Sequence, residues 1–146
     1  MKVFLVRHGE TTGDLEGRYG GNYDDHLTPQ GEEQLKETAS RLTGKDIQII
    51  FTSNLIRAKE SGKIIQSQVG CGIEVVDGIQ ERNYGVLAGL TKEEALERYP
   101  EAVEAHKNPE NTDPEGESLE DFQNRVLAAF KDIFSKEYQT VVIVSH

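Results

Sequence analysis

Two histidines in this chain each follow a short apolar run. His8 comes shortly after residues 3–6, and His146 comes shortly after residues 141–144. Such runs are too short for a helix and are typical of buried strands. Arg7 stands before the first histidine and a glycine follows it, which favours an anionic ligand close to the backbone. Because parallel strands end at one edge of a sheet, where such folds bind ligands, the sequence predicts both histidines in one site.

Four β-rich runs alternate with helical patterns along the chain. The runs cover residues 2–6, 47–52, 73–76 and 140–144. Helical periodicity of apolar residues follows Thr28, Leu55 and Ser118. Thr28 precedes a proline, and Ser118 precedes an aspartate by three residues as in a variant capping box. The alternation predicts a three-layer α/β/α fold with a mostly parallel central sheet, in a single domain over residues 1–146.

The segment 81–114 interrupts this alternation. It is expected to hold a short helix near residues 92–99 and then a polar loop from 106 to 114, together forming a lid over the sheet edge. The glycine-rich residues 17–21 are expected at the mouth of the pocket, either in contact with phosphate or as a simple turn. The two other histidines, His26 and His106, are expected on the surface.

The net charge and the cysteine content limit which binding partners and which cellular compartment are expected. The 146 residues carry 26 acidic and 16 basic side chains, a formal charge of −10. This excess argues against nucleic acid or an anionic membrane as a partner, because both require a basic face. Cys71 is the single cysteine and cannot form an internal disulfide, and the sequence has no apolar run of membrane length. A reducing cytoplasmic setting is therefore expected.

Several motifs together resemble the histidine phosphatase superfamily, which includes the phosphoglycerate mutases. The similar segments occur in the family's order and are residues 7–11 (Arg-His-Gly-Glu-Thr), 24–31, 53–58, 81–85, 116–118 and 145–146. They cover nearly the whole chain. The resemblance implies a phosphoglycerate mutase-like fold and a hydrolase or mutase that acts on a small phosphorylated substrate.

The resemblance also implies a mechanism that passes through phosphohistidine. His8 would be the phosphorylated nucleophile, and His146 would donate to the phosphoryl oxygens. Glu81 would protonate the leaving alkoxide and then activate water. Arg7 and Arg57 would bind the phosphate, and their charges would keep the nucleophilic histidine neutral. No metal or cofactor is expected, so chelators should leave activity unchanged.

Further substrate contacts are implied at four positions. Arg82, Tyr84 and Lys92 match residues that contact substrate in the mutases, although they could equally pack the loop. Asp14 stands where family members often have an asparagine whose amide donates to phosphate. Because a carboxylate repels a phosphate dianion, either Asp14 points away or phosphate binds more weakly than usual.

The reaction class follows from the segment between the lid and the last helix. The mutases use an arginine pair to hold the substrate carboxylate, whereas Arg98 is the only arginine in residues 92–116. This favours a phosphatase for a small phosphate monoester, such as a sugar phosphate. A phosphoglycerate mutase and a truncated, inactive domain that binds phosphorylated ligands are the alternatives.

The last residues differ from the family pattern. In the family a glycine and further sheet and helix normally follow the position of His146, so the C-terminal portion of the usual fold is expected to be missing. The first strand would then have an uncovered edge, and such edges pair readily with other chains. We therefore expect either self-association or reduced stability.

Overall fold

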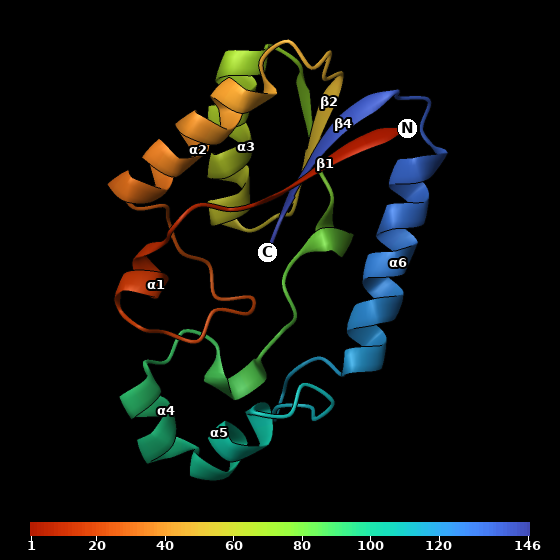
Figure 1. The fold of residues 1–146 in the computed structure, drawn as a ribbon. Coiled ribbons are helices and arrows are strands. Elements are labelled where there is room, and N and C mark those ends of the chain that lie inside the picture. Colours follow the sequence, from red (N-terminus) through yellow and green to blue (C-terminus); the bar gives the residue numbers. More distant parts are fainter.

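In the computed structural model, which describes residues 1–146, four strands form a single parallel sheet. The strands are β1 (Lys2–Arg7), β2 (Ile49–Thr52), β3 (Gly72–Val75) and β4 (Thr140–Ser145). Their order in the sheet is β1-β4-β2-β3, and every neighbouring pair is parallel (Figure 1). The last strand therefore lies beside the first, with Arg7 in register with Ser145. This pairing brings the two predicted histidine segments together.

Each face of the sheet is covered by helices. Helices α2 (Pro29–Leu42) and α3 (Ile56–Val69) cover one face, and α6 (Leu119–Ser135) covers the other (Figure 1). Side chains of β2 and β4 alternate between the faces, as the pleat of a strand requires. Residues facing α2 and α3 include Ile50, Val142 and Val144, and those facing α6 include Ile49, Phe51, Val141 and Ile143. The three-layer α/β/α prediction is confirmed.

Local signals fix where the main helices begin. The hydroxyl of Thr28 accepts a hydrogen bond from the Gly31 N–H at 3.0 Å, and Pro29 occupies the first turn of α2. Ser118 caps α6 in the same way by accepting from the Asp121 N–H at 3.0 Å. The expected capping box at Ser118 is only half formed, because the Asp121 carboxylate accepts from the serine hydroxyl at 2.7 Å rather than from its backbone.

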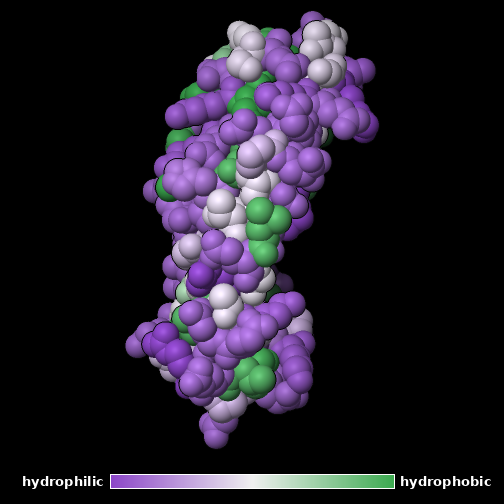
Figure 2. All heavy atoms as spheres, turned by 90° about the vertical axis from the view of Figure 1, so that its left-hand side faces the viewer, coloured by the Kyte–Doolittle hydropathy of each residue, from purple (hydrophilic) through white to green (hydrophobic).

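A second, smaller lobe lies beyond the carboxyl ends of the strands. It contains α4 (Lys92–Arg98) and α5 (Pro100–His106) around a small core of Leu87, Ala95 and Ala102. Figure 2 shows the two lobes joined by a narrower waist, with a mostly hydrophilic surface on that face. The short helix α1 (Thr12–Leu15) lies between them (Figure 1). The segment that follows β3 therefore covers one side of the sheet edge at which the strands end.

The structure corrects the sequence predictions at several boundaries. Strand β2 begins at residue 49 rather than 47, β3 spans 72–75 rather than 73–76, and β1 and β4 each extend one residue further, to Arg7 and Ser145. Helix α5 was not predicted; it begins at Pro100, which is favourable in a first helical turn. The loop after it begins where α5 ends, at His106, as predicted. None of the helices has the length and hydrophobicity needed to span a membrane.

Candidate active site

His8 follows the last residue of β1, and its contacts define which ring nitrogen carries the proton. The carbonyl oxygen of Gly9 lies 2.7 Å from His8 Nδ1, so Nδ1 carries the proton and donates to it. The Nε2 atom keeps its lone pair and lies 3.2 Å from Nε of Arg57. Burial lowers the pKa of His8, the Gly9 contact opposes this, and the charges of Arg57 and Arg7 lower it further. His8 is therefore neutral near pH 7, and its unprotonated nitrogen is Nε2.

Gly9 serves a different purpose from the one predicted. A side chain at this position would place its Cβ 2.5 Å from the Gly31 carbonyl oxygen and 2.5 Å from Leu35 Cδ2. The glycine therefore lets the loop after β1 pass closely over the start of α2, whereas the sequence suggested close approach of a ligand. The Gly9 N–H donates to the hydroxyl of Ser61 at 3.3 Å, which ties this loop to α3 as well.

His146 follows β4 and faces His8 across a shared arginine. The two imidazole rings have centroids 5.2 Å apart. Nδ1 of His146 accepts from Nε of Arg57 at 3.2 Å, and its Nε2 lies 2.8 Å from the hydroxyl of Ser53. Burial, followed by the charge of Arg57, lowers the pKa of His146 to about 3. One guanidinium N–H is thus shared between the lone pairs of two neutral histidines.

Arg57 lies in the first turn of α3 and is held from its other side by the loop before α2. Its Nη1 donates to Asp25 Oδ1 at 3.1 Å and to the Tyr23 carbonyl, and Nη2 donates to the Gly21 carbonyl at 2.7 Å. The side chains of Arg57 and Asp25 are only 4% and 5% exposed. Asp25 Oδ2 in turn accepts from the Gly13 N–H at 3.1 Å. This buried network fixes the orientation of the guanidinium and hence of its Nε.

A cavity of about 170 Å³ opens in front of His8. Three arginines contribute to its lining, so the site is locally positive although the chain as a whole is strongly acidic. The lining residues are Arg7, His8, Thr11, Gly13, Asp14, Arg18, Gly20, Gly21, Arg57, Glu81 and Tyr84. We refer to this cavity as the phosphate pocket, after the ligand that the sequence leads us to expect there. Residues 18, 20 and 21 place the glycine-rich segment in its wall, as expected for the pocket mouth.

Asp14 lines this pocket and has a structural task there. Its Oδ2 accepts from the Thr11 N–H at 2.9 Å, and the Thr11 hydroxyl accepts from the Asp14 N–H at 3.1 Å. The two residues form a reciprocal capping box at the start of α1. The carboxylate is nevertheless close enough to His8 to oppose the lowering of its pKa. Asp14 therefore does not point away from the pocket, and it contributes a negative charge to the site.

Glu81 faces the phosphate pocket from the segment after β3. Its Oε1 accepts from the Arg82 N–H at 2.8 Å. The segment is anchored to α6 by Arg125, whose Nη1 donates to the carbonyls of Gly78 at 3.0 Å and Gln80 at 3.1 Å. Arg125 was not singled out in the sequence, because its role depends on a contact between segments far apart in the chain.

The structure separates the three lid residues that the resemblance implied as substrate contacts. Tyr84 lines the phosphate pocket, and burial raises the pKa of its hydroxyl, with Glu81 adding to the rise. The guanidinium of Arg82 donates to three backbone carbonyls, as in the loop-packing alternative, and the residue also lines a second cavity. These carbonyls belong to Pro109, Asn111 and Glu117. Lys92 is exposed at the start of α4 and lines none of the cavities.

The two remaining histidines have different environments. His26 is exposed and pairs with Glu60, as expected of a surface residue. His106 was also expected on the surface, but its ring lies edge-on to Tyr84 and to Tyr19 and bonds Asp113. The sequence carried no periodic signal for these contacts, since they join the smaller lobe to the loop after α1.

Three further residues of the site were missed by sequence reasoning. Ser53 contacts His146, Asp25 pairs with Arg57, and Arg18 lines the phosphate pocket. The first two lie inside the motifs that carried the family resemblance, which is the signal that could have identified them. The structure contains no cluster of three or more His, Cys, Asp or Glu side chains arranged to hold a metal ion.

Comparison with known proteins identifies the family. Residues 3–146 match the sequence model of the histidine phosphatase superfamily (branch 1). The chain belongs to the histidine phosphatase superfamily. A phosphoglycerate mutase that depends on bisphosphoglycerate, from Cytophaga hutchinsonii, is 34% identical over 99% of this chain and 71% of its own length. Phosphoserine phosphatase 1 of Hydrogenobacter thermophilus is 32% identical over 100% and 71%, respectively.

Solved structures agree with this assignment. The structure of Bacillus stearothermophilus YhfR superposes with a TM-score of 0.90 at 31% identity, over 99% of this chain and 73% of that one. The chain thus spans about 70% of the length of the relatives it matches. As a histidine phosphatase, this enzyme transfers phosphoryl groups in the manner of a phosphatase or a mutase.

Proposed function

We propose that the enzyme is a metal-independent phosphatase for small phosphate monoesters and that His8 is its nucleophile. The observation that carries the proposal is the unprotonated Nε2 of His8, which accepts from the Arg57 Nε–H and belongs to a residue that lines the same pocket as Glu81. Arg7 and Arg57 would bind the dianion, since guanidinium groups match phosphate oxygens in shape and stay charged at working pH. Because its guanidinium is held in place, Arg57 would offer the same Nε–H to a phosphoryl oxygen bound at His8, and its contact with His146 would remain.

The reaction would proceed in two displacements. His8 Nε2 attacks phosphorus, the bond to the ester oxygen breaks, and the carboxyl proton of Glu81 passes to the leaving alkoxide. The Gly9 carbonyl, held by the Nδ1 proton, would stabilise the positive charge of the phosphorylated ring. Glu81 would then take a proton from water as the water attacks phosphohistidine, releasing phosphate. His146 would assist by turning its Nε2–H from the Ser53 hydroxyl to a phosphoryl oxygen as charge develops there.

The environment beyond Glu81 favours hydrolysis over mutase chemistry. A phosphoglycerate carries a carboxylate that needs a cation, and Arg82, the guanidinium nearest Glu81 in sequence, is already committed to three backbone carbonyls. Lys92 is exposed outside the cavities. These placements support a phosphatase whose leaving alcohol is uncharged.

The test combines trapping with variants. Wild-type protein should hydrolyse p-nitrophenyl phosphate in the presence of chelator, and acid-labile phosphate should be trapped on His8. His8→Ala should abolish turnover, whereas His26→Ala, a matched exposed histidine, should not. Glu81→Gln should slow alkyl esters far more than p-nitrophenyl phosphate, because nitrophenolate leaves without a proton.

Other outcomes would point elsewhere. Isomerisation of phosphoglycerate that outpaces phosphate release would identify a mutase. Phosphate trapped on His146 instead of His8 would refute the assignment of the nucleophile. Binding of phosphate without any turnover would favour the phospho-ligand-binding alternative.

We also propose a reducing cytoplasmic setting and no nucleic-acid partner. The support is compositional: Cys71 is the single cysteine, and the formal charge of −10 opposes binding to polyanions. Cell fractionation with an antibody against the chain would test the compartment, and recovery in an extracellular or membrane fraction would contradict it.

A further inference from the structure

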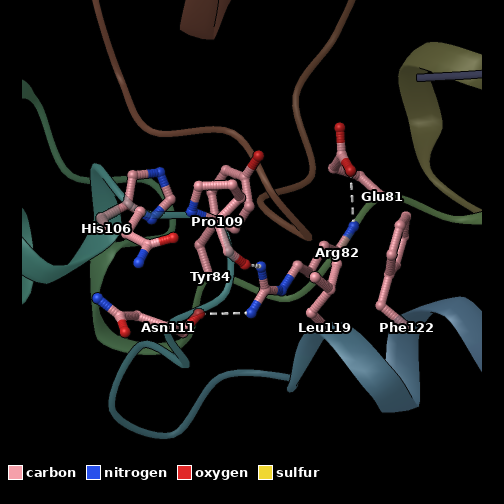
Figure 3. A pocket seen from close by; sticks show the side chains of 9 residues that line it. Glu81, Arg82, Tyr84, His106, Pro109, Asn111, Leu119 and Phe122 are labelled. Carbon is pink, nitrogen blue, oxygen red and sulfur yellow. Dashed lines mark hydrogen bonds between the residues drawn. The ribbon is translucent and has the colours of Figure 1, made fainter.

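A second cavity of about 250 Å³ adjoins the phosphate pocket. Glu81 and Tyr84 line both cavities, so the second one begins where the leaving group of a bound phosphate ester would emerge (Figure 3). Its lining comes from the smaller lobe and from the first turn of α6. These residues are Glu81, Arg82, Tyr84, His106, Asn108, Pro109, Asn111, Leu119 and Phe122. We refer to it as the leaving-group cavity.

His106 is the polar group of this cavity with an unused hydrogen-bonding atom. Its Nδ1 lies 2.8 Å from Oδ2 of Asp113, a carboxylate that is about 95% buried, with 5% exposure. Nδ1 therefore donates to the carboxylate, and Nε2 keeps its lone pair. Nε2 has no hydrogen-bond partner in the chain, and Asp113 Oδ1 is buried without one. The imidazole is thus held in one orientation, and its Nε2 atom has no hydrogen-bond partner.

Aromatic contacts hold the imidazole in place. The Tyr84 ring lies edge-on at 4.7 Å between centroids, and the Tyr19 ring lies edge-on at 5.3 Å. Because Asp113 fixes one nitrogen and two tyrosines fix the ring plane, His106 loses little freedom when a ligand binds. A preorganised acceptor of this kind recognises a hydroxyl and discriminates against an ester that lacks one.

The remaining lining indicates an uncharged, amphipathic ligand. Leu119, Phe122 and Pro109 present apolar surface, and the Asn108 side chain adds an amide. Three N–H groups of Arg82 donate to backbone carbonyls, one from each nitrogen. Sugars present C–H faces to such apolar walls and hydroxyls to polar groups. The cavity is also larger than the phosphate pocket, so it has room for a leaving group bulkier than the phosphoryl group itself.

We propose that the leaving-group cavity holds the sugar of a sugar phosphate and that His106 accepts a hydrogen bond from one of its hydroxyls. This inference rests on the proposed phosphatase function and names its substrate class. In this role His106 is a specificity-determining residue, and Asp113 is a positioning residue that acts through it.

The experiment compares two esters that differ in what they offer to His106. A hexose phosphate, with phosphate on the primary hydroxyl of glucose, presents hydroxyls to the cavity. p-Nitrophenyl phosphate fills it with a ring that carries no hydrogen-bond donor. His106→Ala should lower kcat/KM for the hexose phosphate about tenfold, mostly through KM, and change p-nitrophenyl phosphate turnover by less than about threefold. Asp113→Asn should give the same selective loss in weaker form.

Controls separate this inference from the proposed function. His26→Ala should leave both esters unchanged, and His106→Gln, which keeps a hydrogen-bonding group, should partly restore the hexose phosphate. Equal losses for both esters in His106→Ala, or no loss for either, would overturn the role of His106. Failure of the phosphatase function would instead appear as wild-type protein that hydrolyses neither ester.

A binding measurement applies even to protein without turnover. Calorimetry on His8→Ala protein would compare the hexose phosphate with inorganic phosphate. The hexose phosphate should bind more tightly, and His106→Ala in the same background should remove most of that difference. Equal affinity for the two ligands before the second substitution would contradict the sugar site.

Discussion

The buried pair of Asp25 and Arg57 provides the sharpest test of how the site is assembled. Asp25→Asn keeps the shape of the side chain but removes the charge that faces the Arg57 guanidinium at 3.1 Å. Its amide also cannot accept from both Arg57 and the Gly13 N–H, so one of these donors loses its partner. Both effects act on groups that are almost fully buried.

The expected magnitude follows from that burial. Breaking a buried ion pair from one side typically costs about 3–5 kcal/mol, because a charge is left without compensation. For a domain near 150 residues each kcal/mol shifts Tm by about 2–4 °C, so Tm should fall on the order of 10 °C. Urea denaturation would give the free energy of unfolding directly. Asp24→Asn is the matched control, since Asp24 accepts from the exposed Ile56 N–H and an amide oxygen can replace it.

A second readout distinguishes electrostatics from simple damage. With Asp25 neutral, the uncompensated guanidinium of Arg57 should attract a dianion more strongly, so added phosphate should raise Tm more in Asp25→Asn than in wild-type protein. Equal unfolding free energies for Asp25→Asn and Asp24→Asn, within about 0.5 kcal/mol, would refute the reasoning. A variant that is destabilised but gains no extra response to phosphate would show that Arg57 is held for packing alone.

Three further predictions concern pH, phosphate affinity and association. The pKa of His146 is about 3 in the folded protein and near 6.5 in the unfolded chain, so the unfolded state binds more protons between these pH values. The free energy of unfolding should therefore fall below about pH 6.5, by about 2 kcal/mol at about pH 5. Urea denaturation of His146→Gln should show a flatter pH dependence, and an unchanged slope would contradict the shift. Asp14→Asn keeps an acceptor for the Thr11 N–H while removing a negative charge from the pocket, so inhibition by phosphate should strengthen about tenfold; weaker inhibition would refute this. Leu5 is 69% exposed on β1, which is an edge strand of the sheet. We predict that the protein self-associates with increasing concentration in size-exclusion chromatography and that Leu5→Lys reduces this association. Monomers at all concentrations would contradict the prediction.

The sequence by itself determined the layers of the fold and the main residues of the site. The central strands are continuous apolar runs because parallel strands are buried on both faces, and this signal is local. The same is true of the caps at Thr28 and Ser118, where one side chain bonds a backbone group three residues away. His8, Arg57 and His146 could be placed at one sheet edge because each follows such a strand closely.

The tertiary structure decided which of the charged side chains are free to act. Arg82 resembles a substrate contact in sequence, yet three of its N–H groups donate to carbonyls of residues 109, 111 and 117. His106 resembles a surface histidine, yet Asp113 and two tyrosines orient it beside a cavity. The tautomer of His8 likewise depends on a carbonyl contact that spacing does not reveal. For Arg82 and His106 the contacts that decide this come from the folded chain, through carbonyls of residues 109, 111 and 117 for the arginine and through Tyr19, Tyr84 and Asp113 for the histidine.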